Sequence, residues 1–167
     1  MRLFILGAAG SGKTSLCRYL RGFPARRQAL DVVDVDDEVL RLNWGVWPDI
    51  DTKNNVVRPQ MFEFVCAIPD VLVFDSYLFV EESVLLHHAG FKIVLLEVSE
   101  EEIRRRQAVR LAEEGWTNVE WFDWNQSAIQ TLQEADLIDY VISGEGDVGF
   151  VAAEILRLGE RHAAGSG

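Results

Sequence analysis

The sequence predicts an α/β fold in which a parallel sheet is covered by helices on both faces. Short apolar segments typical of buried strands alternate with segments whose apolar residues recur at helical spacing. Such alternation favours parallel strands joined by crossover helices. A glycine-rich segment, residues 7–14, lies between the first expected strand and the first expected helix. The 167 residues indicate one domain over residues 1–162, with residues 163–167 as a flexible tail.

The first expected strand is residues 2–6, an apolar and β-prone segment. Residues 15–20 follow the glycines with apolar side chains on helical spacing, so a helix is expected there. Residues 29–35 are predicted as the second strand, which ends in acidic side chains and merges into a helix near residues 39–40. The chain therefore opens in the strand–helix order of an α/β fold.

The middle of the chain is less regular. Residues 43–60 mix tryptophan, proline and asparagine without a clear period, and a helix is expected from residue 60 to residue 67. Residues 71–75 are a continuous apolar run closed by an aspartate, as in a buried parallel strand. A helix is expected over residues 80–89, and Gly90 is well placed to cap it.

The last part of the chain returns to regular alternation. Residues 91–98 are predicted as a strand, and Ser99 with Glu102 forms a capping box for the following helix. Gly115 is expected to end that helix. The remaining elements are a helix over residues 125–135, a strand over residues 137–142 and a closing helix from Asp147.

The glycine-rich segment matches G-x-x-x-x-G-K-[ST], the phosphate-binding P-loop, in the strand–loop–helix context that this motif requires. Backbone N–H groups of such a loop converge with a helix N-terminus on an anion. Lys13 is expected to reach the β- and γ-phosphates of a nucleoside triphosphate, and the Thr14 hydroxyl to bind Mg²⁺. The residues assigned to the nucleotide are Gly7, Ala8, Ala9, Gly10, Ser11, Gly12, Lys13, Thr14 and Ser15.

Acidic residues end two expected strands. Asp75 closes a buried strand, where a Walker-B aspartate would hold the water shell of Mg²⁺, although a loop or helix-cap role is an alternative. Asp34 and Asp36 leave the same face if the extended conformation continues. We assign Asp34 to the metal and Asp36 to orienting or deprotonating an acceptor, and the exchange of these roles stays open. The alternative is acidity at a helix start, with Asp37 and Glu38 the first-turn acids.

A basic helix precedes Gly115. Arg106 and Arg110 are four residues apart and share one face. Closing over the phosphates, they would neutralise charge in the transition state, and a lid is expected over about residues 100–124. The alternative is a solvated face paired with neighbouring glutamates.

An acceptor-binding insert is expected over about residues 37–67. Its only basic residues are Arg41, Lys53 and Arg58, so an anionic acceptor needs one or more of them. Arg41 and Arg58 are the assigned acceptor ligands, and a surface role is the alternative for each.

Tryptophans cluster in two places. Trp44 and Trp47 are candidates for stacking on a planar acceptor, with packing of a small helical subdomain as an equal alternative. Trp44 is the assigned contact. Trp116, Trp121 and Trp124 are attributed to core or lid packing.

The formal net charge of −11 disfavours long nucleic acids and anionic membranes as partners. No apolar run approaches membrane-spanning length, and no signal peptide is expected before the first strand. Cys17 and Cys66 lie in apolar stretches without metal-ligand spacing, which favours free thiols and a reducing compartment. The expected location is cytoplasmic, and the oligomeric state stays open.

The sequence resembles the nucleoside and nucleotide kinase group of P-loop proteins. The features that carry the resemblance are the P-loop, the acidic end of the second strand, the Walker-B aspartate and the arginine-bearing helix. Val33-Asp34-Val35-Asp36 resembles the D-x-D of shikimate and gluconate kinases, where one aspartate lies near the metal and the other at the substrate. From residue 71 on, the sequence is similar to deoxynucleoside monophosphate kinases and archaeal kinase-like relatives. The similar runs are VLVFDSYLFVEES, HHAGFKIVLLEVS, EEIRRRQAVR and ADLIDYVISGEGD. The resemblance implies the P-loop NTPase sandwich with five parallel strands in the order 2-3-1-4-5.

Those relatives also show where this sequence departs from the pattern. Their late segment usually reads D-Y-V-I-x-N-x-G and borders the adenine of ATP, whereas Gly144 stands here in the asparagine place. Gly144 is therefore assigned to the nucleotide site through backbone contacts of residues 143–146. The relatives often carry an arginine three places after the Walker-B aspartate, where this chain has Leu78.

The expected function is transfer of the γ-phosphoryl group of ATP, with Mg²⁺, to a small acceptor that enters between residues 36 and 63. The first expected acceptor is a nucleoside or a nucleoside monophosphate. Two alternatives stay open: a kinase of a non-nucleotide hydroxyl metabolite, similar to shikimate and gluconate kinases, and a P-loop ATPase or switch acting on a protein partner. The catalytic candidates are Lys13, Asp36, Arg106 and Arg110, and the metal candidates are Thr14, Asp34 and Asp75.

Overall fold

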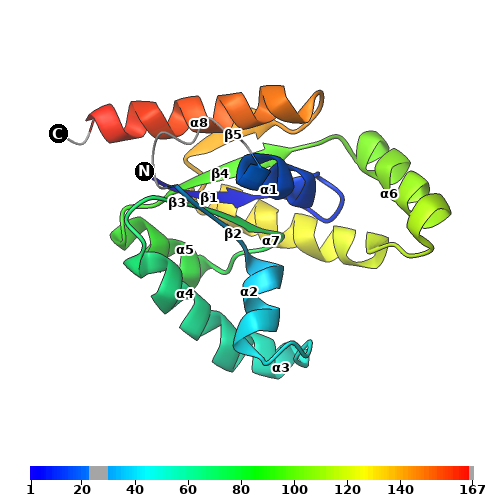
Figure 1. Cartoon of the computed structure of the whole chain (residues 1–167), viewed down its shortest axis with the longest axis horizontal. Helices are drawn as coiled ribbons and strands as arrows, with labels where there is room; N and C mark the ends of the chain where they lie inside the picture. Colours follow the sequence, from blue (N-terminus) through cyan, green and yellow to red (C-terminus); the bar gives the residue numbers. More distant parts are fainter. Residues whose placement is uncertain (23–29, 166–167) are drawn as a thin grey trace.

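Five parallel strands form the centre of the molecule, in the order β2-β3-β1-β4-β5 (Figure 1). The structure is a computed structural model that describes residues 1–22 and 30–165, without the side chains of residues 163–165. The strands are β1 (Arg2–Leu6), β2 (Asp31–Asp34), β3 (Val71–Asp75), β4 (Lys92–Glu97) and β5 (Tyr140–Ser143). The predicted fold class and strand order are confirmed.

Helices cover both faces of this sheet (Figure 1). The helices are α1 (Lys13–Gly22), α2 (Val35–Leu42), α3 (Ile50–Thr52), α4 (Arg58–Ala67), α5 (Val80–His88), α6 (Glu100–Glu114), α7 (Phe122–Glu134) and α8 (Val148–Gly165). Two short turns complete the set, the π-helical η1 (Lys53–Val57) and the 3₁₀-helical η2 (Val119–Trp121). α1 and α8 pack on one face, and α4, α5 and α7 pack on the other.

The alternation of side chains along β1 divides the core into these two layers. Leu3 and Ile5 are fully buried on the side of α1 and α8, whereas Phe4 and Leu6 are fully buried on the side of α4, α5 and α7. Successive side chains of a strand point to opposite faces, so a strand buried on both faces is apolar throughout. This explains why the central strands are continuous apolar runs in the sequence.

Local signals placed several element ends correctly. Ser99 Oγ accepts a hydrogen bond from the Glu102 backbone N–H at 3.4 Å at the start of α6, and Gly115 ends that helix at φ 76°. The other half of the predicted capping box is not formed, because the Ser99 backbone N–H donates to Glu145 Oε1 at 2.9 Å and the Glu102 carboxylate accepts from Arg105 and Arg106. α8 continues through Gly165, so its backbone runs beyond the expected start of the tail at residue 163. Residues 166 and 167 lie outside the described residues. None of the described helices combines the length and the apolar character needed to cross a bilayer.

The region after β2 differs from the expectation. The strand ends at Asp34, and Val35 already belongs to α2, so the extended conformation does not continue to Asp36. Asp34 caps α2, because its Oδ1 accepts a hydrogen bond from the Asp36 backbone N–H at 3.1 Å. Asp36 is therefore a first-turn acid as well. The expected strand start at Ala29 lies outside the described residues.

Residues 43–60 are more regular than their composition indicates. α3 and η1 lead directly into α4, which begins at Arg58, two residues earlier than expected. In η1 the Arg58 backbone N–H donates to the Lys53 carbonyl, a bond that spans five residues. Such π-helical turns often mark functional sites.

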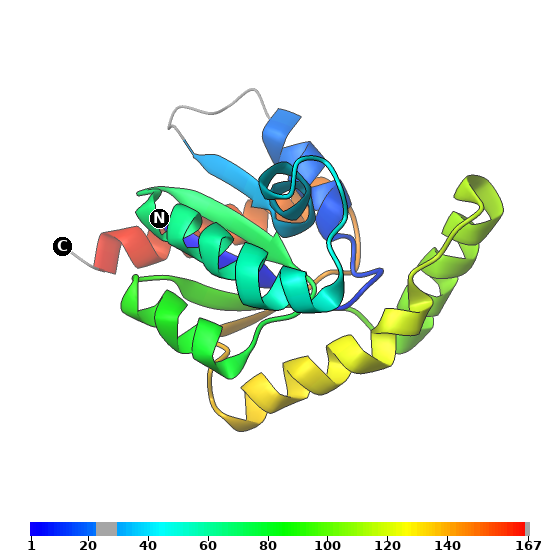
Figure 2. The same ribbon diagram turned by 90° about the horizontal axis from the view of Figure 1, so that it is seen from below.

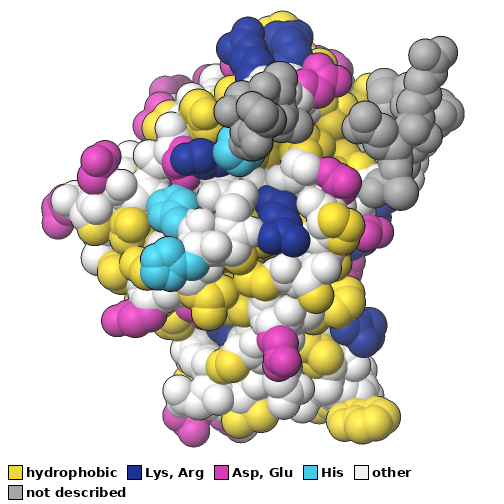
Figure 3. Space-filling model, turned by 90° about the vertical axis from the view of Figure 1, so that its left-hand side faces the viewer, with side chains coloured by type: hydrophobic (Ala, Val, Ile, Leu, Met, Phe, Trp, Pro, Cys, Tyr) yellow, Lys and Arg dark blue, Asp and Glu magenta, His cyan; other side chains and the backbone are white. Residues whose placement is uncertain are grey.

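The two ends of the sheet differ in what covers them. α6 and α7 extend beyond the carboxyl ends of the strands, on the side where β1 enters α1 (Figure 2). The opposite end shows mixed charges and exposed histidines (Figure 3). There Asp139 accepts a hydrogen bond from the Ile93 backbone N–H at 2.8 Å, and its carboxylate lies 2.6 Å from Lys92 Nζ and 2.8 Å from His87 Nε2. These contacts hold the segment before β5 against β4 and α5.

Candidate active site

The P-loop leaves β1 at the carboxyl end of the sheet and enters α1 at Lys13. Gly10 and Gly12 adopt φ values of 89° and 99°, which side chains other than glycine rarely allow. The Lys13 ammonium turns back onto the loop and donates to the Gly7 carbonyl at 2.5 Å and the Ala8 carbonyl at 3.0 Å. The glycine pattern therefore produces the curled backbone that the motif predicts.

Two buried amides from distant helices lie against this loop, and one of them, Asn125, hydrogen-bonds to it. Asn125 Oδ1, from α7, accepts a hydrogen bond from the Ala9 backbone N–H at 3.0 Å. Gln107, from α6, donates to Asn118 Oδ1 at 2.5 Å and accepts from Thr117 Oγ1 at 2.7 Å. Neither amide belongs to a recognisable motif, so sequence analysis missed both. Their role depends on α6 and α7 folding back beside the loop.

A cavity of about 230 Å³ lies above the P-loop and brings most of the predicted site residues together. Its walls come from the loop, from the ends of β2 and β3, and from α6. The lining residues are Ala9, Gly10, Gly12, Lys13, Thr14, Ser15, Asp34, Asp36, Phe74, Asp75, Ser76, Arg106, Gln107, Arg110 and Asn118. Asp34, Asp36, Asp75, Arg106 and Arg110 thus surround one space.

Burial shifts the charge balance inside this cavity. It lowers the pKa of Lys13 to about 8, against the opposing effect of the neighbouring aspartates. Burial and the nearby charge of Asp36 raise the pKa of Asp34 to about 6. Burial and Asp75 also raise the pKa of Asp36, while Lys53 and Lys13 act in the opposite direction. An added cation would stabilise the ionised form of these carboxylates.

The donor chemistry of the cavity fits Mg²⁺. This ion prefers oxygen ligands and is usually held by one or two carboxylates together with phosphates and water. Asp34, Asp75 and the Thr14 hydroxyl supply oxygens at this cavity. Within residues 1–22 and 30–165, no group of three or more histidine, cysteine, aspartate or glutamate side chains is arranged to hold a metal by itself.

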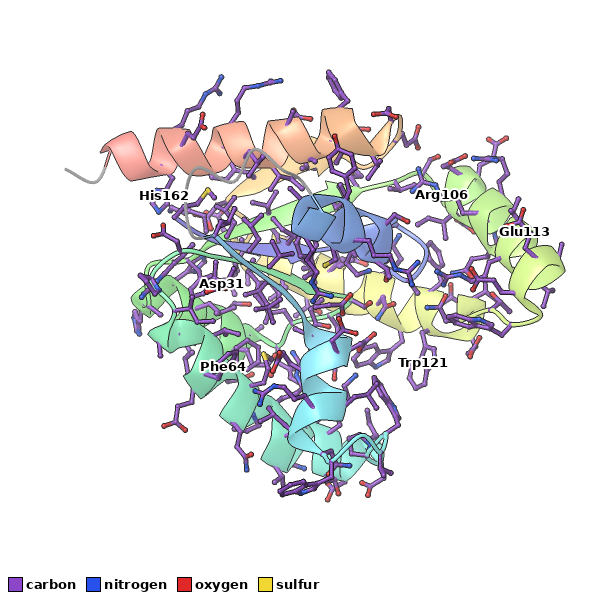
Figure 4. All side chains as sticks on the ribbon, viewed as in Figure 1. Asp31, Phe64, Arg106, Glu113, Trp121 and His162 are labelled. Carbon is purple, nitrogen blue, oxygen red and sulfur yellow. The ribbon has the colours of Figure 1, made fainter. Side chains whose placement is uncertain are left out.

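Arg106, on α6, reaches both the P-loop and the turn after β5 (Figure 4). Its Nη1 donates to the Ser11 carbonyl at 2.9 Å, and its Nη2 donates to the Gly144 carbonyl at 3.1 Å. Its Nε donates to Glu102 Oε1 at 2.7 Å, which orients the guanidinium. One arginine therefore joins the P-loop to the turn that follows β5.

The neighbouring arginines of α6 differ from one another. Arg110 lines the cavity, lies 4.6 Å above the Trp116 ring and is 3.7 Å from Glu114. Arg104 and Arg105 are exposed and pair with glutamates of their own helix. Arg106 and Arg110 thus share the face that lines the cavity, as their spacing predicted, and the lid function itself stays a prediction.

A second hollow of about 420 Å³ lies beside the P-loop, next to the turn after β5. Gly144 and Gly146 line it together with Ser15, Arg105 and Val148. A Cβ atom on Gly144 would lie 2.6 Å from Val98 Cγ2 and 2.8 Å from Leu96 Cγ. Close packing against β4 thus accounts for glycine where the resembling kinases have asparagine.

Asp75 is not a free carboxylate. Its Oδ2 accepts a hydrogen bond from Arg58 Nη1 at 2.7 Å, and its Oδ1 accepts from the Ser76 backbone N–H at 2.7 Å. Arg58 also donates to both carboxylate oxygens of Glu82, at 2.9 and 2.8 Å, and its side chain is fully buried. This Asp75–Arg58–Glu82 network was not predicted. It places Arg58 outside the cavity lining, so the acceptor role assigned to Arg58 has no support in its contacts.

Arg41 and Trp44 also lie away from the cavity. Arg41 donates to Glu38 Oε2 at 2.6 Å and lies 5.3 Å above the Phe64 ring. Trp44 is 93% exposed and has a positive φ of 58°. The structure therefore brings neither residue to the site where the sequence placed them.

Lys53, and neither Arg41 nor Arg58, is the basic residue next to Asp36. Its Nζ lies 3.6 Å from Asp36 Oδ1, 4.6 Å from the Trp47 ring centroid and 5.2 Å from the Tyr77 ring centroid. The side chain is almost completely buried. Its basic character was noted in the sequence, but no spacing signal linked it to Asp36.

No protein-family model matches the chain, and no curated protein sequence matches it. Solved structures do match its fold. A shikimate kinase from Bacteroides thetaiotaomicron has a TM-score of 0.67 and 18% identity over 96% of this chain and 98% of its own. A gluconokinase from Sinorhizobium meliloti has a TM-score of 0.61 and 16% identity over 99% and 97% of the two chains.

A sugar kinase from a Janibacter species has a TM-score of 0.67 and 15% identity over 93% of this chain and 92% of its own. All three matches cover nearly the whole of both chains. The chain therefore has the fold of the P-loop kinases, as the motifs indicated. At identities of 15%, 16% and 18%, the similarity is evidence for the shared fold alone.

Proposed function

We propose that this protein is an Mg²⁺- and ATP-dependent phosphotransferase that moves the γ-phosphoryl group of ATP to a small acceptor. One observation carries the proposal: Lys13 and Thr14 of the P-loop, the strand-end carboxylates and two arginines of α6 line one cavity. Phosphoryl transfer needs positioning and charge neutralisation around the moving group, and these residue types supply both. The fold of the P-loop kinases supports the same activity.

Each residue has a distinct task in this proposal. Lys13 binds the β- and γ-phosphates, and the backbone N–H groups of the loop hold them in place. Thr14, Asp34 and Asp75 hold Mg²⁺, which when bound neutralises charge on the phosphates. Arg106 and Arg110, within a lid over about residues 100–124, stabilise the charge that develops on the transferring group. The turn after β5, including Gly144, borders the base of ATP.

Asp36 marks the acceptor side of the cavity. A carboxylate whose pKa is raised is a better proton acceptor than one that keeps its ordinary pKa. In our proposal Asp36 orients the acceptor oxygen and takes its proton, and residues 37–67 form the acceptor-binding segment. Acceptors within reach of this chemistry include nucleosides and nucleoside monophosphates. Non-nucleotide hydroxyl metabolites are the alternative acceptor class.

A panel of small acceptors tests the proposal directly. ATP consumption is measured with Mg²⁺ alone and with each acceptor, and the product is identified by its mass. We expect ATP turnover to depend strongly on one acceptor class and Lys13→Ala to abolish it. ATP turnover that no acceptor increases would instead favour the ATPase or switch alternative.

A further inference from the structure

The acceptor side of the site carries little positive charge that a ligand could use. Binding an anion away from water requires a cation, and arginine is best suited to a carboxylate or a phosphate. The segment 37–67 contains only Arg41, Lys53 and Arg58 as basic residues, and residues 76–82 and 115–135 contain none. The question is therefore whether any of these three cations is available.

Arg58 is fully committed to the protein itself. Its guanidinium donates to Asp75 and to both oxygens of Glu82, its exposed fraction is 0%, and it lies 4.1 Å from the Tyr77 ring centroid. Turning it toward a ligand would leave two carboxylates inside the protein without their partner. Breaking a buried ion pair in this way is strongly unfavourable.

Arg41 points to a different surface. It pairs with Glu38 and covers the Phe64 ring, and its side chain is 55% exposed. It does not line the cavity that contains Asp36. It therefore offers no charge to an acceptor placed beside that carboxylate.

Lys53 lies beside the site, but its charge is balanced. Asp36 is 3.6 Å away, and the ammonium lies against the rings of Trp47 and Tyr77. The remaining cations of the cavity, Lys13, Arg106 and Arg110, belong to the ATP phosphates in the proposed function. No uncompensated cation among the described residues therefore faces an acceptor on this side.

Aromatic rings supply the rest of this surface. The rings of Tyr77 and Trp124 meet edge to face with their centroids 4.8 Å apart, and those of Trp121 and Trp124 do so with centroids 6.4 Å apart. Trp47, Trp121 and Trp124 are 50%, 51% and 40% exposed, so their rings retain free surface. In Figure 4, Trp121 points away from the ribbon toward the space between α7 and α2. We call Trp47, Lys53, Tyr77, Trp121 and Trp124 the aromatic surface.

Two tryptophans of this surface are preceded in the sequence by acidic residues. Glu120 lies in η2 beside Trp121, and Asp123 lies in α7 beside Trp124. Flat, partly exposed rings favour the apolar face of a base or a sugar. Acidic neighbours instead repel a phosphate or a carboxylate.

Resting on the proposed kinase function, we infer that the acceptor is an uncharged hydroxyl compound with a flat or apolar face, of the nucleoside or sugar class. Its apolar face lies on the aromatic surface, and its reacting hydroxyl meets Asp36. The hydroxyl oxygen forms a bond to the γ-phosphorus of ATP as the bond to the β–γ bridging oxygen breaks. ADP leaves with that oxygen, and the hydroxyl proton passes to the Asp36 carboxylate. A nucleoside monophosphate or a sugar acid is excluded as the preferred acceptor.

Matched acceptor pairs test this inference. Each pair compares an uncharged acceptor with an anionic one. The pairs are adenosine with adenosine monophosphate, thymidine with thymidine monophosphate, ribose with ribose 5-phosphate, and glucose with gluconate. ATP, Mg²⁺ and ionic strength are held constant, and products are identified by mass. We expect the preferred acceptor to be an uncharged member whose kcat/KM exceeds that of its anionic partner by about tenfold or more.

The outcomes separate the two levels of the proposal. Transfer that favours the phosphate- or carboxylate-bearing member overturns the inference and leaves the kinase function intact. Binding of ATP without transfer to any member of either set overturns the proposed function, and the inference falls with it.

Variants of the aromatic surface give a second test with the preferred uncharged acceptor. Trp124→Ala is expected to raise the acceptor KM about tenfold with little change in the KM for ATP, since a base–aromatic stack contributes about 1–3 kcal/mol. Phe150→Ala on α8 is the matched control, because Phe150 is 64% exposed and does not line either cavity beside the P-loop. Equal effects of the two variants, or a loss confined to melting temperature, would overturn the aromatic surface as the acceptor site.

Discussion

The phosphate side and the acceptor side of the proposed site are built in different ways. On the phosphate side, the contacts come mainly from backbone shape: two glycines at positive φ, the start of α1 and a lysine folded onto the loop. On the acceptor side, long charged side chains lie inside the protein and neutralise one another. Arg58 bridges Asp75 and Glu82, and Lys53 lies beside Asp36.

This difference shows that two residues of the same type can differ in whether their side chains are available to a ligand. Arg106 and Arg58 are both arginines bound to a glutamate, but Arg106 is 24% exposed and lines the cavity, whereas Arg58 is completely buried. The phosphate side therefore retains cations for a ligand, and the acceptor side uses its arginine to organise the protein. A small-molecule phosphotransferase needs charge where the phosphates bind and a shaped surface where the acceptor binds.

The largest expected effect concerns the buried network. Arg58→Met leaves Asp75 and Glu82 without their partner, so we expect the free energy of unfolding to fall by about 3–5 kcal/mol. Arg41→Ala removes an exposed pair and is expected to cost about 0.5 kcal/mol or less. Urea denaturation of both variants measures the contrast. If the two lose the same stability, Arg58 is available to ligands and the two sides of the site are more alike than we conclude.

The next effect concerns the phosphate side. Lys13→Ala should lower phosphoryl transfer by about 10²–10³-fold, the typical loss when one preorganised electrostatic contact is removed. Lys92→Ala is the control, because Lys92 pairs with Asp139 at the opposite end of the sheet. Turnover and melting temperature are measured for both. A folded Lys13→Ala protein with near-normal turnover would contradict the P-loop assignment.

Asp36 lies between the two sides. Asp36→Asn keeps the shape of the side chain and removes its charge, so transfer should fall by about 10²-fold while ATP affinity changes little. Asp37→Asn is the neighbouring control, since Asp37 pairs with Arg21 at the surface. Titration with ATP and Mg²⁺ is measured beside turnover. A collapse of ATP affinity with intact acceptor binding would assign Asp36 to the metal and Asp34 to the acceptor.

The lid arginines are expected to have smaller effects. Arg106→Ala and Arg110→Ala should each lower kcat about 10–100-fold, more than they raise the KM for ATP, because a hydrogen bond to a charged group contributes about 1.5–3 kcal/mol. Arg→Lys should not restore activity, since an ammonium cannot grip two oxygens as a planar fork does. Arg104→Ala is the control on the exposed face of α6, because Arg104 pairs with Glu100 and lines neither cavity beside the P-loop. Steady-state kinetics in which all three variants behave alike would mean that α6 is a solvated helix.

The smallest expected effect is a pH dependence of the protein without ATP and Mg²⁺. Burial raises the pKa of Asp34 to about 6 in the folded state, above its ordinary value of 3.8. The folded state then binds more protons than the unfolded state between about pH 4 and pH 6, so this group makes the protein less stable as pH rises through that window. Asp34→Asn retains a helix cap and should stabilise the protein by about 1 kcal/mol at pH 7.

At pH 4 the same substitution should change stability little. Denaturation curves at several pH values test this pattern. A difference between the two proteins that is constant from pH 4 to pH 7 would show that Asp34 is not shifted upward. Adding Mg²⁺ and ATP should reverse the sign at pH 7, because a bound cation favours the carboxylate.

The sequence by itself determined the fold class and, through its resemblance to P-loop kinases, the strand order, and it predicted the residues of the proposed phosphate side. These depend on local signals: glycines that permit positive φ, apolar runs that fill a two-sided sheet, and arginine spacing on one helix face. Such signals act within a few residues of one another. These signals can therefore be recognised without knowledge of how the elements pack.

Only the tertiary structure decided the acceptor side. Whether Arg58 faces a ligand or the interior depends on β3 and α5 delivering Asp75 and Glu82 to the same buried spot, and Lys53 meets Asp36 only because η1 packs beside α2. Asn125, which accepts a hydrogen bond from the P-loop, and Gln107, which lies beside Gly10, likewise come from helices far along the chain. A long polar side chain can pair in many directions, and burial with a distant partner selects one of them.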